Sequence, residues 1–400
     1  MRWVGASYGP SSDGEGRVPR ILVLTRYGRL SPTTRVRFLQ FIEQFERGGD
    51  AGLGFDVAPL LEDHSLQRFY DDGTRSPAYL LKRYAKRVRL LLRSKRYELL
   101  WIEKELFPGA PALAEWLLAA LGVKVVVDYD DAAYCWYRDN PIWLVRTFLS
   151  RKIDAVCRAA TVVITGNETL AAYARDAGAG KVVIVPSVID TTKYGQSRPA
   201  SNTSEFVVGW IGTPSNVRYL EIFKVALADM AAGRNFKFLT IGAPARLFAG
   251  VPQEAHPWSA ETEIELLGRC DCMVAPLGDG SFESGKCGFK VIQGMAAGLP
   301  VIASPIGVIK DIIRHGENGF LAENAAQCGD IMRQLRADTS MRRRIGDKAR
   351  ETIARSYSTS AVSQSVAHVL YEALGGQYLS RAPTAPSFTV GPGDCGGFAA

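Results

Sequence analysis

The sequence predicts an α/β protein made of two doubly wound domains, each built on a parallel sheet. Three observations favour this fold class. Short apolar, β-branched runs alternate with helical patterns, and a polar stretch near residue 200 interrupts the alternation before it starts again. The chain of 400 residues, of which 47% are hydrophobic, is also long enough to bury two ordinary cores.

The first half contains the elements of one such domain, expected over residues 18–190 after a disordered tail at 1–17. Its runs are apolar throughout, as in strands that are buried on both faces and linked by helices. Strands are expected at 20–27, 55–61, 97–102, 124–131, 161–166 and 181–187, with helices such as 36–47, 110–121, 143–159 and 168–177 between them.

The second half repeats the pattern after a linker at 191–204. We expect this domain over 205–358, a helix at 359–375 that crosses back to the first domain, and a disordered tail at 376–400. Ligands of such sheets bind outside the carboxyl ends of the strands, so a cleft between the domains is predicted to hold the chemistry. Strands are expected at 206–212, 236–242, 271–277 and 300–304, and helices near 219–232, 261–268, 289–297, 325–336 and 340–356.

The net charge of +7 is concentrated in residues 82–96, which hold eight Lys or Arg and no acid. One local stripe argues against general nucleic-acid binding, which spreads charge over a face or groove. Apolar residues recur there at helical spacing, so the segment is either a helix on an anionic membrane surface or a helix that packs its apolar side inward and solvates its charges. The membrane-surface candidates are Lys82, Arg83, Lys86, Arg87, Arg89 and Arg93.

Other features bear on the compartment. The seven cysteines form no Cys-x-x-Cys pair, which favours a reducing environment. No run reaches about 18 apolar residues, and the N-terminus has no signal-peptide core. The four histidines are too dispersed to suggest a local metal site. We therefore expect a cytoplasmic protein, peripheral to the membrane if the basic stripe binds it.

A turn follows the first strand of the second domain, in the stretch 209–216 (GWIGTPSN). Gly212 would let a ligand approach the backbone, and Thr213 offers a hydrogen-bond donor of the kind that holds phosphate oxygens. Arg218 follows, in a first helical turn where a cation does not serve the helix dipole. The alternative is an ordinary capped turn with a solvated arginine.

A second glycine-broken loop, 285–290 (GKCGFK), opens a helix. Gly288 frees the loop, the helix is expected to begin at Phe289, and Lys286 and Lys290 lie four residues apart at its start. Two cations at a helix N-terminus repel each other and oppose the dipole, so an anion would stabilise the pair. The alternative is two solvated surface lysines.

The stretches 293–304 (QGMAAGLPVIAS), 313–321 (IRHGENGFL) and 186–190 (PSVID), with Gly212 and Arg218, resemble glycosyltransferase family 4. The resemblance covers about residues 20–375 and implies the two-domain GT-B fold, a nucleotide-sugar donor such as a UDP- or GDP-sugar, and retention of anomeric configuration. It also implies that Lys290 faces the donor diphosphate, which it would neutralise with Lys286 and Arg218 in place of a metal, so that no cofactor is expected.

The sequence departs from the family where many members carry two glutamates eight residues apart. Gly285 and Gln293 stand at the matching positions. Gln293 would still hydrogen-bond a ribose hydroxyl of the donor. Glu283, two residues before the first position, is the candidate substitute for the missing catalytic carboxylate.

In the first domain, the stretch 128–132 (DYDDA) closes a strand. The resemblance puts it on the acceptor side, where Asp130 or Asp131 would orient or deprotonate an acceptor hydroxyl. Helix capping and an Asp-x-Asp metal site are the alternatives. Arg35, in the turn after the first strand, is a candidate for an acceptor or phosphate loop.

Together these features predict a metal-independent glycosyltransferase that uses a glycan or lipid-linked saccharide acceptor, as in bacterial polysaccharide or glycoconjugate synthesis. A sugar-nucleotide epimerase or hydrolase on the same fold is one alternative. A non-catalytic homologue that binds a nucleotide or a partner is the other.

Overall fold

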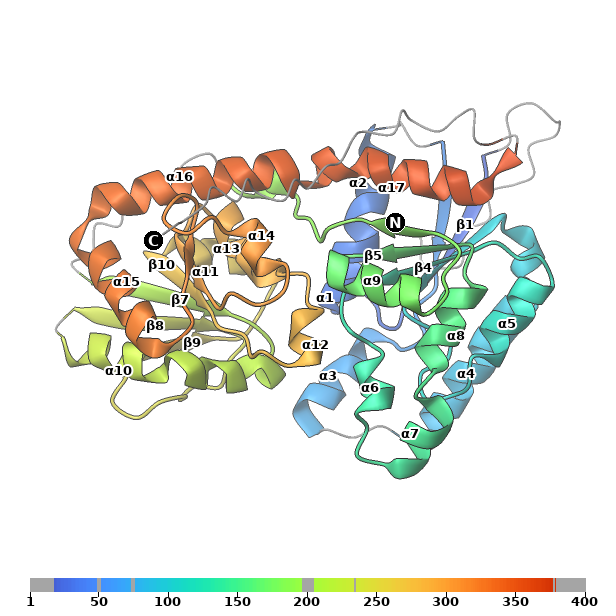
Figure 1. The fold of residues 1–400 in the computed structure, drawn as a ribbon, viewed down its shortest axis with the longest axis horizontal. Coiled ribbons are helices and arrows are strands. Elements are labelled where there is room, and N and C mark those ends of the chain that lie inside the picture. Colours follow the sequence, from blue (N-terminus) through green and yellow to red (C-terminus); the bar gives the residue numbers. More distant parts are fainter. Residues whose placement is uncertain are drawn as a thin grey trace, which may run out of the picture. The chain divides into compact units, whose positions relative to one another are not determined.

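The computed structural model describes residues 18–48, 52–72, 76–195, 205–233, 235–376 and 378. These residues form two compact units, each around its own sheet (Figure 1). The N-terminal unit contains the described residues up to Ser187 and those from Val362 onward, and the C-terminal unit contains Val188–Ala361. Most of the predicted linker and nearly all of both predicted tails lie outside the described residues.

The N-terminal unit contains a parallel six-stranded sheet in the order β2-β1-β3-β4-β5-β6. The parallel pairing was predicted from strands that are apolar throughout, and β1, β3, β4 and β5 are almost completely buried. The strands are β1 Arg20–Leu24, β2 Gly54–Val57, β3 Leu99–Glu103, β4 Val125–Tyr129, β5 Val162–Thr165 and β6 Val182–Ile184.

Helices cover both faces of this sheet. The connections β2 to β3, β3 to β4 and β4 to β5 all run in one direction, and right-handed crossovers therefore place α4, α5 and α8 on the same face. Figure 1 shows α2 and α17 on the other side. The helices are α1 Pro32–Thr34, η1 Arg35–Leu39, α2 Gln40–Gly48, α3 Asp63–Asp72, α4 Pro77–Leu91, η2 Ser94–Arg96, α5 Leu113–Ala120, α6 Cys135–Arg138, α7 Trp143–Leu149, α8 Lys152–Ala159, α9 Glu168–Asp176 and α17 Thr359–Leu374.

The single helix predicted over 143–159 is wrong, because α7 ends at Leu149 and α8 begins at Lys152. Lys152 is almost completely buried. Its ammonium forms an ion pair with Glu105 and donates to the carbonyl oxygen of Phe107 at 2.6 Å. This buried polar anchor fixes the start of α8 independently of α7.

The C-terminal unit contains a second parallel six-stranded sheet, in the order β12-β11-β10-β7-β8-β9. Its two edge strands, β9 and β12, were not predicted, because both are short and only partly buried. The strands are β7 Phe206–Ile211, β8 Phe236–Ile241, β9 Gln253–His256, β10 Cys272–Ala275, β11 Val301–Ala303 and β12 Phe320–Leu321.

Helices of the C-terminal unit follow the predicted alternation. The helix predicted to begin at Phe289 does begin there. The helix predicted at 219–232 is a 3-10 segment that continues into an α-helix at Lys224. The helical elements are η3 Thr191–Lys193, η4 Pro214–Phe223, α10 Lys224–Ala232, α11 Glu263–Gly268, α12 Ser281–Ser284, α13 Phe289–Ala296, α14 Ile309–Ile312, α15 Ala325–Ala337 and α16 Thr339–Ser356.

Two further predictions concern the cysteines and the absence of a membrane-spanning helix. Six cysteines lie in the described residues, all six are buried, and none of these six forms a disulfide. Among the helices of the described ranges, none combines the length and the apolar character that crossing a membrane requires.

Candidate functional site

The ammonium of Lys290, in the first turn of α13, lies against the end of β7. Its Nζ sits over the Trp210 ring, 4.9 Å from the centroid, and a Cβ atom built on Gly212 would lie 2.7 Å from it. Within the described ranges, the Lys290 ammonium has neither a hydrogen bond nor an ion pair. Burial and the charge of Lys286 lower the pKa of Lys290 to about 7. A desolvated cation in this position would be stabilised by an anion beside Gly212.

Lys286 joins the two loops that were predicted to share a ligand. Its Nζ donates to Asn216 Oδ1 at 3.0 Å and lies 5.0 Å from the centroid of the Tyr219 ring. Asn216 in turn donates to Thr213 Oγ1 at 2.6 Å. The turn after β7 and the loop before α13 therefore form one polar surface, with Thr213, Lys286 and Lys290 around it.

Glu283 lies in α12 and is engaged by two side chains of η4. Its Oε1 accepts from Arg218 at 3.1 Å and also accepts from the Tyr219 hydroxyl, which Arg218 contacts as well. Burial alone would raise the pKa of Glu283, but the Tyr219 hydroxyl, a backbone N–H and the charges of Arg218 and Lys286 together lower it. Arg218 is thus held by a carboxylate, and Glu283 is ionised at neutral pH.

Gln293, the second departure from the paired-glutamate pattern, is buried on α13. Its side chain lies near the hydroxyl of Tyr194 and lowers the pKa of that group, although burial raises this pKa overall. The ribose contact of Gln293 remains a prediction.

Two glycines allow the close backbone approaches at this surface. Gly288 precedes α13 with a φ of +66°, and a Cβ atom there would lie 2.7 Å from Ile312 Cδ1. Gly242 follows β8 with a φ of +81°, and its Cβ would lie 2.2 Å from the Gly212 carbonyl oxygen. Both positions therefore disfavour other residues by conformation, and Gly242 does so by its contact with the backbone as well.

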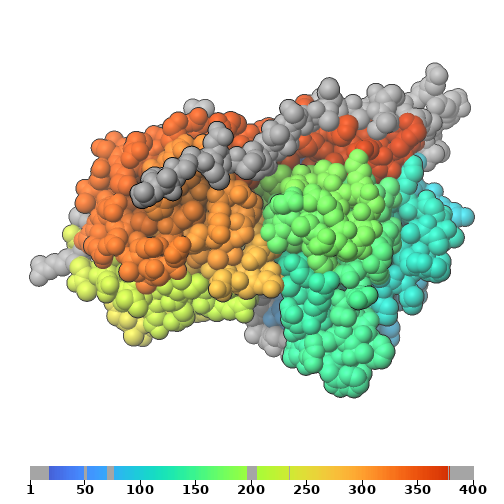
Figure 2. Space-filling model, viewed as in Figure 1, coloured from blue at the N-terminus to red at the C-terminus, as the bar shows by residue number. Residues whose placement is uncertain are grey.

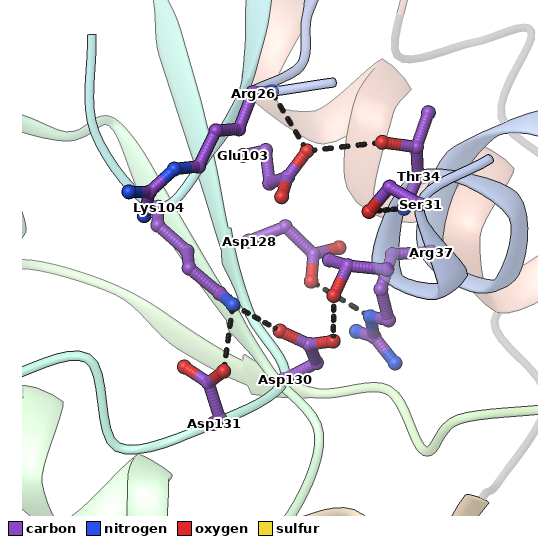
Figure 3. Close-up of polar contacts among 10 residues, drawn as sticks. Arg26, Ser31, Thr34, Arg37, Glu103, Lys104, Asp128, Asp130 and Asp131 are labelled. Carbon is purple, nitrogen blue, oxygen red and sulfur yellow. Dashed lines mark hydrogen bonds and ion pairs between the residues drawn. The ribbon is translucent and has the colours of Figure 1, made fainter. Parts of the chain in front are cut away.

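In the N-terminal unit, Lys104 joins the two candidate aspartates at the carboxyl edge of the sheet (Figure 3). Its Nζ lies 2.9 Å from Asp130 Oδ1 and 2.8 Å from Asp131 Oδ2, and Thr33 Oγ1 donates to Asp130 Oδ2 at 2.7 Å. Lys104 thus bridges two adjacent aspartates, while Asp128, the first aspartate of the Asp-x-Asp pattern, is paired with Arg37. Neither aspartate caps a helix, since α6 begins only at Cys135.

Charge pairing keeps this cluster ionised. Burial would lower the pKa of Lys104, but Asp130, Asp131 and Glu103 raise it. Burial likewise opposes ionisation of Asp130, yet Lys104 and Thr33 hold its pKa below the ordinary value. Lys104 also has a φ of 60°, unusual for a residue with a side chain and typical of strain held at functional sites.

A second buried ion pair lies behind this cluster. Arg37 Nε donates to Asp128 Oδ1 at 2.8 Å, and Arg37 Nη1 donates to the Val185 carbonyl oxygen at 2.8 Å. Burial raises the pKa of Asp128 to about 6, against the lowering effect of Arg37. Glu103 accepts from the Arg26 backbone N–H at 2.9 Å and from Thr34 Oγ1 at 3.2 Å, as Figure 3 shows.

Sequence reasoning missed Lys104, Arg37 and Glu103. The sequence did contain a signal for Lys104, which is a cation directly after β3. Both β3 and β4 were predicted, and if they are neighbours in a parallel sheet, their carboxyl ends bring Lys104 close to Asp130 and Asp131. Arg35, the predicted loop residue, donates to the carbonyl oxygens of Arg29 and Leu30, each at 2.9 Å. Its role toward a ligand stays a prediction.

The assignment of Arg83 and Arg87 to a membrane surface is wrong. Both arginines are buried under α4, where they donate to carbonyl oxygens of the strand ends. Arg83 also pairs with Glu62. Burial lowers the pKa of Arg87 to about 9. The remaining four candidates are exposed on α4 or just after it: Lys82, Lys86, Arg89 and Arg93.

Two family models match the chain. The model described as "Glycosyl transferases group 1" matches residues 205–338, and the model described as "Glycosyl transferase 4-like domain" matches residues 46–187. A curated relative, N-acetyl-alpha-D-glucosaminyl L-malate synthase of Bacillus anthracis, is 30% identical over 112 residues. That aligned segment is 28% of this chain and 28% of the relative.

Solved structures share the fold over most of the chain. The Anabaena protein HepE in complex with UDP-glucose has a TM-score of 0.66 at 17% identity, covering 88% of this chain and 99% of HepE. WaaG, a glycosyltransferase involved in lipopolysaccharide biosynthesis, has a TM-score of 0.61 at 13% identity, covering 88% of this chain and 99% of WaaG. At these identities the likeness establishes the fold, which is that of GT-B proteins.

Because the two family models together match more than half of the residues, the chain belongs to the glycosyltransferases of the GT-B fold.

Proposed function

We propose that the protein is a metal-independent glycosyltransferase that moves a sugar from a nucleoside-diphosphate donor to a hydroxyl of a glycan or lipid-linked saccharide. The observation that carries the proposal is the half-buried side chain of Lys290, whose ammonium lies beside Gly212 with a pKa lowered to about 7. The UDP-glucose bound by HepE is consistent with a nucleotide-sugar donor.

In the proposed reaction, the bond from the anomeric carbon to the diphosphate oxygen breaks, the acceptor oxygen bonds to that carbon, and the acceptor hydroxyl proton passes to the departing diphosphate. The diphosphate leaves with the electron pair. Lys290 and Lys286, with Arg218 at the rim, stabilise the charge that develops on it. Loop hydroxyls such as Thr213 and the N-terminus of α13 supply hydrogen-bond donors to the same oxygens.

Glu283 is the proposed carboxylate toward the donor sugar. Its lowered pKa makes it an acceptor of hydrogen bonds from sugar hydroxyls rather than a proton donor. Retention of anomeric configuration and the use of a hexosyl donor are part of the proposal and come from the family resemblance.

Asp130 and Asp131 are proposed to orient the acceptor. A carboxylate whose pKa is held low by Lys104 is a weak base at neutral pH, so we assign these residues to accepting a hydrogen bond from the acceptor hydroxyl. We also propose that the exposed basic residues of α4 hold the protein at the inner face of a membrane, where a lipid-linked acceptor would lie.

The test is release of nucleoside diphosphate from UDP-, GDP- and dTDP-sugars in EDTA, with and without saccharide and lipid-linked saccharide acceptors. Transfer requires that an acceptor accelerates release and appears in a larger product. A rate that is independent of every acceptor would support the hydrolase or epimerase alternative. Binding of a sugar nucleotide without turnover would support the non-catalytic one.

A further inference from the structure

Exposed apolar side chains of the described residues are concentrated in one part of the N-terminal unit. Of the fifteen large hydrophobic residues that are exposed, eleven lie on or beside three helices. They are Leu81, Val88 and Leu92 on α4, Leu113, Trp116, Leu117 and Leu121 on or after α5, and Ile142, Trp143, Leu144 and Phe148 on or before α7. Soluble proteins rarely gather so much apolar surface without a partner.

These helices are neighbours in the fold. The crossover connections place α4 and α5 on the same face of the sheet, and the Tyr84 hydroxyl of α4 contacts the Pro108 carbonyl oxygen just before α5. Helix α5 packs on α8, which directly follows α7. Figures 1 and 2 show α7 at the lower tip of this unit.

Helix α4 presents an apolar stripe and a basic stripe side by side. Leu81, Val88 and Leu92 recur at helical spacing, and each is followed in the chain by an exposed cation. Leu92 remains 79% exposed, so the stripe is not covered by the unit itself. The inward face of α4 is instead held by Arg83, Arg87 and their carbonyl partners.

Helix α5 has a solvent face without a charged residue. Its only charged side chain, Glu115, is buried and accepts from the Leu106 backbone N–H at 2.8 Å. Trp116 and Leu117 are 66% and 51% exposed. On α7, Trp143 and Phe148 are 62% and 74% exposed, and Arg146 is the adjacent charge.

The electrostatic character of the three segments is uniform. Residues 77–96, 111–124 and 141–152 contain nine exposed Lys or Arg besides the buried Arg83, Arg87 and Lys152, and the buried Glu115 is their only acid. A protein partner for such a face would need a matching apolar and acidic surface. An anionic bilayer offers both properties at once, because headgroups attract the cations while the boundary with the acyl chains accepts tryptophan, leucine and phenylalanine.

We infer that the outward faces of α4, α5 and α7 form a lipid-inserting surface that binds an anionic bilayer. The basic stripe of α4 attracts the protein to the headgroups, and the apolar side chains of α5 and α7 then enter the interface. This inference adds insertion to the attachment by α4 included in the proposed function. Its test measures binding to lipid rather than sugar transfer, so the two can fail separately.

The test uses the full chain with vesicles of phosphatidylcholine alone or mixed with phosphatidylglycerol, sedimented at low and at high salt. Insertion is read from tryptophan quenching by brominated acyl chains. One variant, Trp116→Gln with Leu117→Gln, removes apolar contact on α5, and Trp143→Gln with Phe148→Gln does so on α7. Lys82→Gln with Lys86→Gln and Arg89→Gln neutralises α4. Val225→Gln, at an exposed apolar residue of the C-terminal unit, is the matched control.

We expect the wild type to prefer anionic vesicles at least tenfold, to stay bound partly at high salt and to be quenched. The α5 and α7 variants should keep binding at low salt but lose at least tenfold of the binding at high salt, together with the quenching. The α4 variant should lose low-salt binding, and the Val225→Gln control should match the wild type. Equal binding to neutral and anionic vesicles, binding unchanged in the α5 and α7 variants, or apolar variants that only convert a dimer to a monomer would overturn the inference.

Discussion

Binding of the donor should be accompanied by proton uptake at Lys290. With a pKa of about 7 in the free protein, the lysine is only about one-tenth protonated at pH 8. A bound diphosphate restores the ordinary preference for the charged form, so about 0.9 proton should be taken up at pH 8 and about 0.1 at pH 6.

The assay is calorimetric titration with the nucleoside-diphosphate sugar that binds, in buffers of different ionisation enthalpy. A sugar ester of the diphosphate is preferable to the free diphosphate, whose terminal phosphate itself titrates near pH 6. The dependence of the observed enthalpy on buffer ionisation gives the number of protons directly.

Two variants separate Lys290 from other groups. Lys290→Met should abolish the uptake, and Lys286→Met should reduce it at pH 8, because removing the neighbouring charge raises the pKa of Lys290 in the free protein. The reasoning is refuted if uptake at pH 8 is below about 0.2 proton in the wild type, or if Lys290→Met leaves it unchanged.

Three further predictions concern stability. The free Lys290→Met protein should be more stable than the wild type by about 1 to 3 kcal/mol at pH 7, because a partly desolvated cation is removed. Since the pKa of this lysine is lowered on folding, the gain in stability should be complete below pH 7 and vanish toward pH 10.5. Denaturant melts that show no such trend with pH would contradict this prediction. Lys104→Met should lower the free energy of unfolding by about 1 to 3 kcal/mol by leaving the partly buried Asp130 and Asp131 without their cation, and a loss under 1 kcal/mol in urea titrations would refute the pairing. Gly288→Ala should cost about 1 kcal/mol more than Gly316→Ala, which shares the positive φ but has open space around its Cβ, and equal costs would show that Ile312 simply moves aside.

The predictions that the structure confirms were based on residues that are close to one another in the sequence. The parallel sheets followed from strands that are apolar throughout, and the start of α13 followed from Gly288 and the loop before it. The spacing of Lys286 and Lys290 predicted two cations at one helix start. In the structure, the charge of Lys286 lowers the pKa of Lys290, and Lys286 donates to Asn216 in the other loop that was expected to bind the anion.

Contacts between distant segments were the part that the sequence did not predict. Lys104 meets Asp130 and Asp131 from a neighbouring strand, and Arg37 reaches Asp128 across 91 positions. Arg83 belongs to a run of eight basic residues in which nothing in the spacing separates the buried side chains from the exposed ones. Its burial depends on the carbonyl oxygens of Pro59 and Leu60, whose position is set by the sheet.

The central claim is that the loops after β7 and before α13 hold a nucleoside diphosphate without a metal. Calorimetric titration with UDP-, GDP- and dTDP-sugars in EDTA tests it most directly, with Lys290→Met and the exposed-lysine control Lys310→Met measured in parallel. The account predicts that one nucleotide class binds in EDTA, that Lys290→Met weakens it by about 1 to 3 kcal/mol and that Lys310→Met does not. Binding that appears only after Mg²⁺ or Mn²⁺ is added, or no binding under either condition, would contradict it.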